Sequence, residues 1–162
     1  MKKEIPDVMR SLPRQCQAVV VHDDLATKQR AGELWGAIVN NMGQDVPCTV
    51  TYMFAEQVEQ APVMERASQI DIVIVSMHDL ARFMANIAGW LSDWLTADTC
   101  LPRALFVLHE GEEDRQLVNF LRTLTEFAGV TMFSCGRETN HVQKTTRSER
   151  GRCFERLTVS VP

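Results

Sequence analysis

Histidine and carboxylate side chains gather at three separate places along the chain, and such groups could bind a metal ion. The three places are His22-Asp23-Asp24, His78-Asp79 and His109-Glu110. Imidazole and carboxylate groups are ligands for divalent transition metals, and clustered acidic groups suit magnesium. If the fold brings the three places together, the candidate ligands of a divalent metal are His22, Asp23, Asp24, His78 and His109.

The same side chains also have a structural interpretation. An aspartate just before a helix accepts hydrogen bonds from the first N–H groups of that helix. Asp24 and Asp79 each precede an amphipathic stretch and would serve in this way. The histidines would then be ordinary polar loop residues at the ends of strands. The choice between the two interpretations depends on the elements that position these groups.

Five short apolar runs rich in β-branched residues alternate with amphipathic stretches. The runs cover residues 17–21, 48–54, 70–75, 104–108 and 130–134. This alternation is typical of βα units, whose crossovers are right-handed. It predicts an α/β fold of the flavodoxin-like kind: a three-layer α/β/α sandwich around a mostly parallel five-stranded sheet in the order 2-1-3-4-5. Since ligands of such sheets bind outside the carboxyl ends of the strands, the polar groups would share one edge.

The predicted strand order depends on the apolar patterns of the second and third runs. Residues 48–54 alternate between apolar and polar, which suits an edge strand, whereas residues 70–75 are apolar on both faces apart from Asp71, which suits the centre. Between them, Pro62 predicts the start of a short helix, because proline is tolerated at the first helical position.

Trp90 and Trp94 lie in a stretch, residues 80–95, that predicts an amphipathic helix. Residues four apart lie on one face of a helix, so the two indoles are neighbours. They are either part of the core or a stripe that binds a partner protein.

Composition indicates one domain, over residues 1–136, followed by a basic tail at 137–162. The chain has 162 residues, 45% of them hydrophobic, which is enough for one sizeable core. The net charge is −4, which argues against nucleic acid as a partner, but the tail holds six basic and three acidic residues. We expect the tail to pack on the same domain or on an anionic partner, with residues 154–161 as an extra strand or a docked segment.

No apolar run approaches the ~20 residues that a membrane span requires, and no signal-peptide pattern follows Met1. The five cysteines are odd in number and contain no CxxC pair, which argues against a disulfide framework or a structural zinc site. The expected location is therefore the cytoplasm, with the thiols reduced and no contact with a membrane.

Through about residue 135 the chain resembles the receiver domains of two-component response regulators. The resemblance rests on the segments Val19-Val20-Val21-His22-Asp23-Asp24 and Asp71-Ile72-Val73-Ile74-Val75-Ser76. In that family an acidic pair after the first strand holds magnesium, and an aspartate at the end of the third strand accepts a phosphoryl group. Here Asp23 with Asp24, or His22 with Asp23, matches the acidic pair, and Ser76 takes the acceptor position.

The chain departs from the receiver pattern at the groups that carry its chemistry. Serine cannot form the acyl phosphate of an aspartate acceptor. The hydroxyl residue expected after the fourth strand falls on Leu108 or His109, and the lysine expected after the fifth falls on Ser134 or Cys135. The resemblance therefore implies a degenerate receiver that is not phosphorylated.

Two functions follow from these residues. The first is a signalling or protein-interaction module that acts through a protein partner or a second copy of itself. The second is a metal-dependent enzyme or metal-binding domain that uses the carboxyl edge of the first, third and fourth strands. Neither a GxGxxG nor a Walker motif supports nucleotide binding, and no GxSxG motif supports a serine hydrolase.

Overall fold

The computed structural model describes residues 15–43, 45–99, 102–110 and 114–136. Within these ranges strands and helices alternate along the chain, as the sequence predicts. The basic tail at 137–162, with its predicted extra strand, lies outside the described residues, so those predictions stay predictions.

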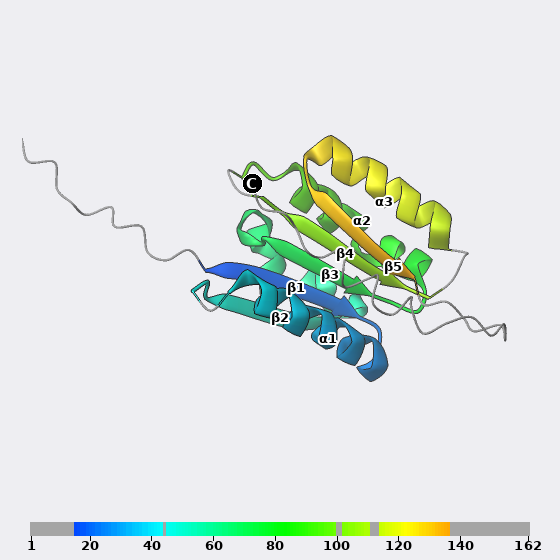
Figure 1. The fold of residues 1–162 in the computed structure, drawn as a ribbon. Coiled ribbons are helices and arrows are strands. Elements are labelled where there is room, and N and C mark those ends of the chain that lie inside the picture. Colours follow the sequence, from blue (N-terminus) through cyan, green and yellow to red (C-terminus); the bar gives the residue numbers. More distant parts are fainter. Residues whose placement is uncertain (1–14, 44, 100–101, 111–113, 137–162) are drawn as a thin grey trace, which may run out of the picture.

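The sheet is parallel throughout and has the predicted strand order. Its strands are β1 (Cys16–His22), β2 (Cys48–Phe54), β3 (Ile72–Ser76), β4 (Ala104–His109) and β5 (Thr131–Gly136). They lie side by side in the order β2-β1-β3-β4-β5 (Figure 1). All residues of β3 are buried, as expected for a central strand, whereas β2 alternates between buried or half-buried and exposed positions, as expected for an edge. The chain therefore has a flavodoxin-like α/β fold.

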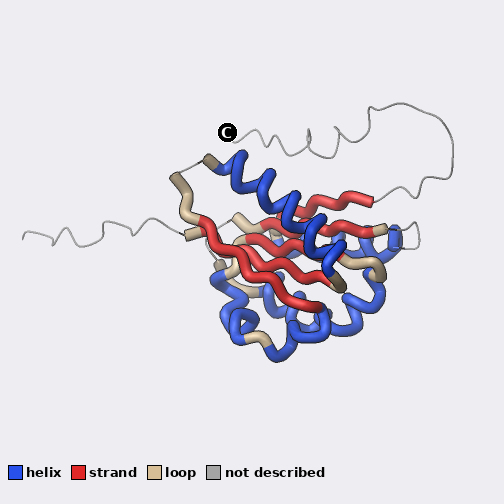
Figure 2. The backbone as a smooth tube through the Cα atoms, turned by 90° about the horizontal axis from the view of Figure 1, so that it is seen from below, coloured by secondary structure: helices blue, strands red, loops and turns tan. Residues whose placement is uncertain are grey.

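Helices cover both faces of the sheet. The helix α1 (Leu25–Met42) lies on one face, and η1 (Ala55–Gln60), η2 (Pro62–Gln69), α2 (Leu80–Thr96) and α3 (Arg115–Ala128) lie on the other (Figure 2). The helices α1 and α3 end at glycines with positive φ, 84° at Gly43 and 68° at Gly129, a backbone conformation that glycine adopts without steric cost. Pro62 is the first residue of η2, as predicted.

The core consists of two apolar layers, one on each side of the sheet. Val19 and Val21 of β1 point into the layer beneath α2 and α3, whereas Val20 points into the layer beneath α1. This alternation follows from the two-residue period of a strand, and it lets the central strands contribute to both layers. None of the described helices is long and apolar enough to cross a membrane.

Candidate functional site

The carboxyl ends of β1, β3 and β4 meet at one edge of the sheet, as the sequence predicts. His22 is paired in register with Ser76, and Ser76 with Leu108. The loops that follow these residues carry Asp23, Asp24, His78 and Glu110. We use the name polar cluster for the linked side chains found here, which are Asp23, Asp24, Arg30, Ser76, His78 and Glu110.

Asp24 caps α1, as the structural interpretation of this residue predicts. The backbone N–H of Thr27 donates to Asp24 Oδ1 at 2.8 Å, and Thr27 Oγ1 accepts in return from the N–H of Asp24 at 2.9 Å. This reciprocal pair is a capping box, and it satisfies backbone donors that the helix cannot use. Asp79 likewise accepts from the N–H of Arg82 at 3.1 Å at the start of α2. The predicted capping roles of both aspartates are confirmed.

His78 joins three carboxylates across the carboxyl edge. Its Nδ1 lies 2.7 Å from Glu110 Oε2 and its Nε2 lies 2.9 Å from Asp24 Oδ2. Its backbone N–H also donates to Asp23 Oδ2 at 2.8 Å. Two ring contacts with carboxylates favour the imidazolium, in which both nitrogens donate. Hydrogen bonds to Glu110 and Asp24 therefore raise the pKa of His78.

The pKa of Asp24 is lowered to about 2 by the same arrangement. The largest cause is the backbone N–H of Thr27, and the hydrogen bond to His78 comes next. Each donor stabilises the carboxylate form over the acid. The cap and the polar cluster thus share one ionised side chain.

Arg30 of α1 is the second centre of the polar cluster, and the sequence analysis missed it. Its Nε donates to Ser76 Oγ at 3.1 Å, and its Nη1 donates to Glu110 Oε1 at 3.1 Å. Its Nη2 donates to the carbonyls of Leu108 at 3.1 Å and Met77 at 3.3 Å. One guanidinium thus ties α1 to the ends of β3 and β4.

A sequence signal for Arg30 existed. Thr27, Ala31 and Leu34 form the buried stripe of α1, and position 30 adjoins that stripe at helical spacing. A basic residue bordering an inward-facing stripe must find acceptors or reach water, since an unpaired buried charge is costly. The acceptors of Arg30 lie at the ends of strands that are far from α1 in sequence, so the spacing of residues in α1 does not identify them.

His22 and His109 stand apart from the polar cluster. The Nδ1 atoms of both rings are buried, and no hydrogen-bond partner for either lies in the described part of the chain. The His22 ring packs on Phe54 with ring centroids 4.5 Å apart, and burial, followed by the charge of Lys28, lowers its pKa. The His109 ring lies against Gly136, where a Cβ atom would come within 2.9 Å of it.

Asp114 is a further buried acid at this edge that sequence analysis did not single out. It precedes α3, and burial raises its pKa. The charge of His109 and hydrogen bonds from the backbone of Leu80 and Glu110 act in the opposite direction. Burial outweighs these favourable contacts, so protonation of Asp114 begins at a higher pH than for an exposed aspartate.

The predicted metal ligands are therefore only partly brought together. Asp24 contacts the His78 ring and Asp23 accepts from the His78 backbone N–H, whereas His22 and His109 are packed elsewhere. Across the residues that the structure describes, no group of three or more His, Cys, Asp or Glu side chains is arranged to hold a metal ion. Both ring nitrogens of His78 are hydrogen-bonded, so binding of a metal by this ring would require it to give up its bond to Glu110 or to Asp24. Metal binding at this edge stays a prediction.

The two tryptophans of α2 pack against each other, with ring centroids 6.2 Å apart and planes 14° from parallel. Trp94 is completely buried and donates from Nε1 to the carbonyl of Ile70 at 2.9 Å. A partner could not reach its ring, so Trp94 has the core role. Trp90 is half-buried at the border of the same core.

Comparison with protein-family models and with curated proteins finds no match to this chain. The fold and the site therefore define its class: a flavodoxin-like α/β domain whose carboxyl edge carries an internally paired cluster of charged side chains.

The polar cluster predicts a pH dependence of stability that a His78→Gln variant should remove. Because the pKa of His78 is raised above its ordinary value of 6.5, the folded state binds this proton more tightly than the unfolded state. The resulting stabilisation is complete below pH 6.5 and is lost as the pH rises through the raised pKa. Urea unfolding should be measured for wild type and His78→Gln from below pH 6.5 to above the raised pKa. The difference between their free energies of unfolding should shrink as the pH rises.

His22 supplies the control, because its contribution has the opposite sign. Its pKa is lowered in the folded state, so protonation of the unfolded chain near pH 6.5 costs stability as the pH falls. The stability of the wild type relative to His22→Gln should therefore decline towards acidic pH. Parallel curves for wild type and His78→Gln would contradict the paired His78 described here.

Proposed function

We propose that this domain is a non-phosphorylatable, receiver-like signalling or protein-interaction module. One observation carries the proposal: the Arg30 guanidinium is bonded to Ser76 Oγ, the group in the position where a receiver has its phosphoacceptor. The resemblance of the segments around Asp23, Asp24 and Ser76 to receiver domains also supports the proposal.

The chemistry of the polar cluster supports this proposal. Ser76 is completely buried, and its hydroxyl is a hydrogen-bond acceptor for Arg30. The carboxylate of Glu110 is divided between Arg30 and His78, with one oxygen for each. The Arg30 guanidinium therefore already occupies Ser76 and Glu110 at the edge where a receiver binds magnesium and a phosphoryl group. An edge of this kind presents one permanent state, which suits constitutive recognition of a partner.

Incubation of the full chain with acetyl phosphate and Mg²⁺ tests the proposal. We expect the intact mass to stay unchanged, since no carboxylate stands at the acceptor position. An added mass of about 80 Da, one phosphoryl group, on Asp23 or Asp24 would overturn it. A parallel sample with Mg²⁺ alone serves as the control.

The alternative, a metal-binding domain or metal-dependent enzyme, draws support from the contact of Asp23, Asp24 and His78. Metal analysis of the same preparation separates the two functions. Under the proposal, bound metal is well below one ion per chain. Stoichiometric metal that disappears in His78→Ala but persists in His22→Ala would favour the alternative instead.

A further inference from the structure

The outer edge of β2 is open within the described part of the chain. β2 pairs with β1 along its whole length, from Cys16 opposite Cys48 to His22 opposite Phe54, and it is the first strand of the sheet order. The pairing is one residue to one residue, so no bulge interrupts it. An edge strand of this length presents a row of backbone donors and acceptors to a further strand.

The direction of those backbone groups follows from the first ladder bond. The N–H of Cys16 donates to the carbonyl of Pro47 at 2.8 Å. Alternate residues of a strand turn to the same side, so Pro47, Thr49, Thr51 and Met53 face β1. The N–H and C=O groups that face outward therefore belong to Cys48, Val50, Tyr52 and Phe54.

β2 lacks the features by which edge strands avoid pairing. Natural edges carry lysine or another charge, a proline, a bulge, or are very short. The strand Cys48-Thr49-Val50-Thr51-Tyr52-Met53-Phe54 has seven residues, no charge and no proline. It is also rich in β-branched and aromatic residues, which favour strand pairing.

We propose that β2 pairs antiparallel with β2 of a second copy of this chain, about a two-fold axis at Thr51. In this register Val50 lies opposite the second copy's Tyr52, and Cys48 lies opposite the second copy's Phe54. Every outward-facing backbone group of the strand then has a partner, because the outward set is symmetric about Thr51. The two sheets join into one continuous sheet. This inference does not depend on the proposed function.

Charge and side-chain chemistry favour a second copy as the occupant. An uncharged strand selects no oppositely charged peptide, and two identical uncharged strands bring no like charges face to face. At the axis the two Thr51 side chains meet in a non-hydrogen-bonded pair, where cross-strand side chains approach most closely. Threonine pairs are favourable there.

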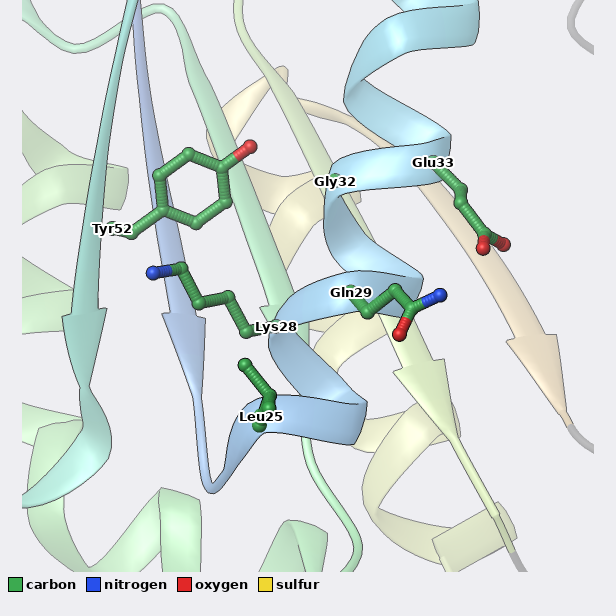
Figure 3. Close-up of a pocket in the computed structure, with 6 residues that line it drawn as sticks. All are labelled: Leu25, Lys28, Gln29, Gly32, Glu33 and Tyr52. Carbon is green, nitrogen blue, oxygen red and sulfur yellow. The ribbon is translucent and has the colours of Figure 1, made fainter.

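On the face of the sheet that carries α1, the surface next to β2 is hollowed, and side chains that the added strand presents on this face would lie beside the hollow. A shallow hollow lies between β2 and α1, lined by Leu25, Lys28, Gln29, Gly32, Glu33 and Tyr52 (Figure 3). Lys28 Nζ lies 5.4 Å from the centre of the Tyr52 ring in this hollow. Tyr52 and Val50 are half-buried on this face, so the neighbouring Val50 of the second copy would extend an existing apolar strip.

The mass of the protein in solution tests the pairing. In sedimentation equilibrium over a range of concentrations, the wild type should approach twice the chain mass of 18.4 kDa. Thr51→Lys places two like charges opposite each other at the axis and should weaken association about tenfold or more. The matched control is Thr131→Lys, an exposed threonine on β5 at the other edge of the sheet, which should associate as the wild type does.

A cysteine at the axis tests the register and does not rely on a disruptive variant. Residues of a non-hydrogen-bonded antiparallel pair have Cα atoms about 4.5 Å apart, within the range of a disulfide. Under mild oxidation Thr51→Cys should form a covalent dimer in larger yield than the wild type or Thr131→Cys. A monomer at every concentration, an equal loss with Thr131→Lys, or no excess cross-linking at position 51 would each overturn the proposal.

Discussion

Replacing Arg30 with alanine should lower the free energy of unfolding by about 2 to 3 kcal/mol. The substitution removes donors to Ser76, Glu110 and two backbone carbonyls. The Arg30 and Glu110 side chains are 23% and 26% exposed, so water replaces these bonds only in part. Urea unfolding followed by circular dichroism measures the change.

Arg82 provides the matched control for this substitution. It also pairs with a glutamate, Glu56, but the two side chains are 58% and 71% exposed. Exposed ion pairs contribute little, so Arg82→Ala should change the free energy of unfolding by less than about 1 kcal/mol. Arg30→Lys should fall between the two, because an ammonium cannot reproduce the planar fork of the guanidinium. Equal effects of Arg30→Ala and Arg82→Ala would mean that the polar cluster does not hold the edge together.

Much of the fold was predictable because the burial of a strand determines which of its positions are apolar. Residues 70–75 are apolar on both faces because β3 lies between two helical layers, and residues 48–54 alternate because β2 lies at an edge. Those two patterns, together with the strand order that is common for flavodoxin-like sheets, led to the predicted order. The start of η2 was also predictable, because the preference of proline for the first helical position depends only on neighbouring residues.

The polar cluster was predictable only in part, because its contacts are long-range. Strand order placed Asp23, Asp24 and His78 at one edge, and their contacts bear this out. The sequence does not show that His22 packs against Phe54, since this contact depends on the register between β1 and β2, which places the two residues opposite each other. Arg30 was missed because its acceptors belong to the ends of β3 and β4, which only tertiary structure brings beneath α1.

Replacing Trp94 with alanine should have the largest effect of any substitution considered, about 4 kcal/mol of unfolding free energy. The side chain is completely buried, and its loss leaves a large cavity beneath α2. The Ile70 carbonyl loses its donor, and the Arg103 guanidinium, 5.1 Å from the centre of the ring, loses a cation–π contact. Arg103 also donates to the carbonyl of Leu95 at 3.1 Å, so the end of α2 is disturbed as well.

Trp90→Ala is the control for this prediction, since it removes the same side chain one helical turn away. Trp90 is half-buried, so its loss exposes less new surface and should cost less than half as much. Trp94→Phe should cost about 2 kcal/mol, because the ring is retained in part while the Ile70 carbonyl loses its donor. If both alanine variants cost the same, Trp94 would not be the centre of this layer, and the face of α2 would again be a candidate surface for a partner.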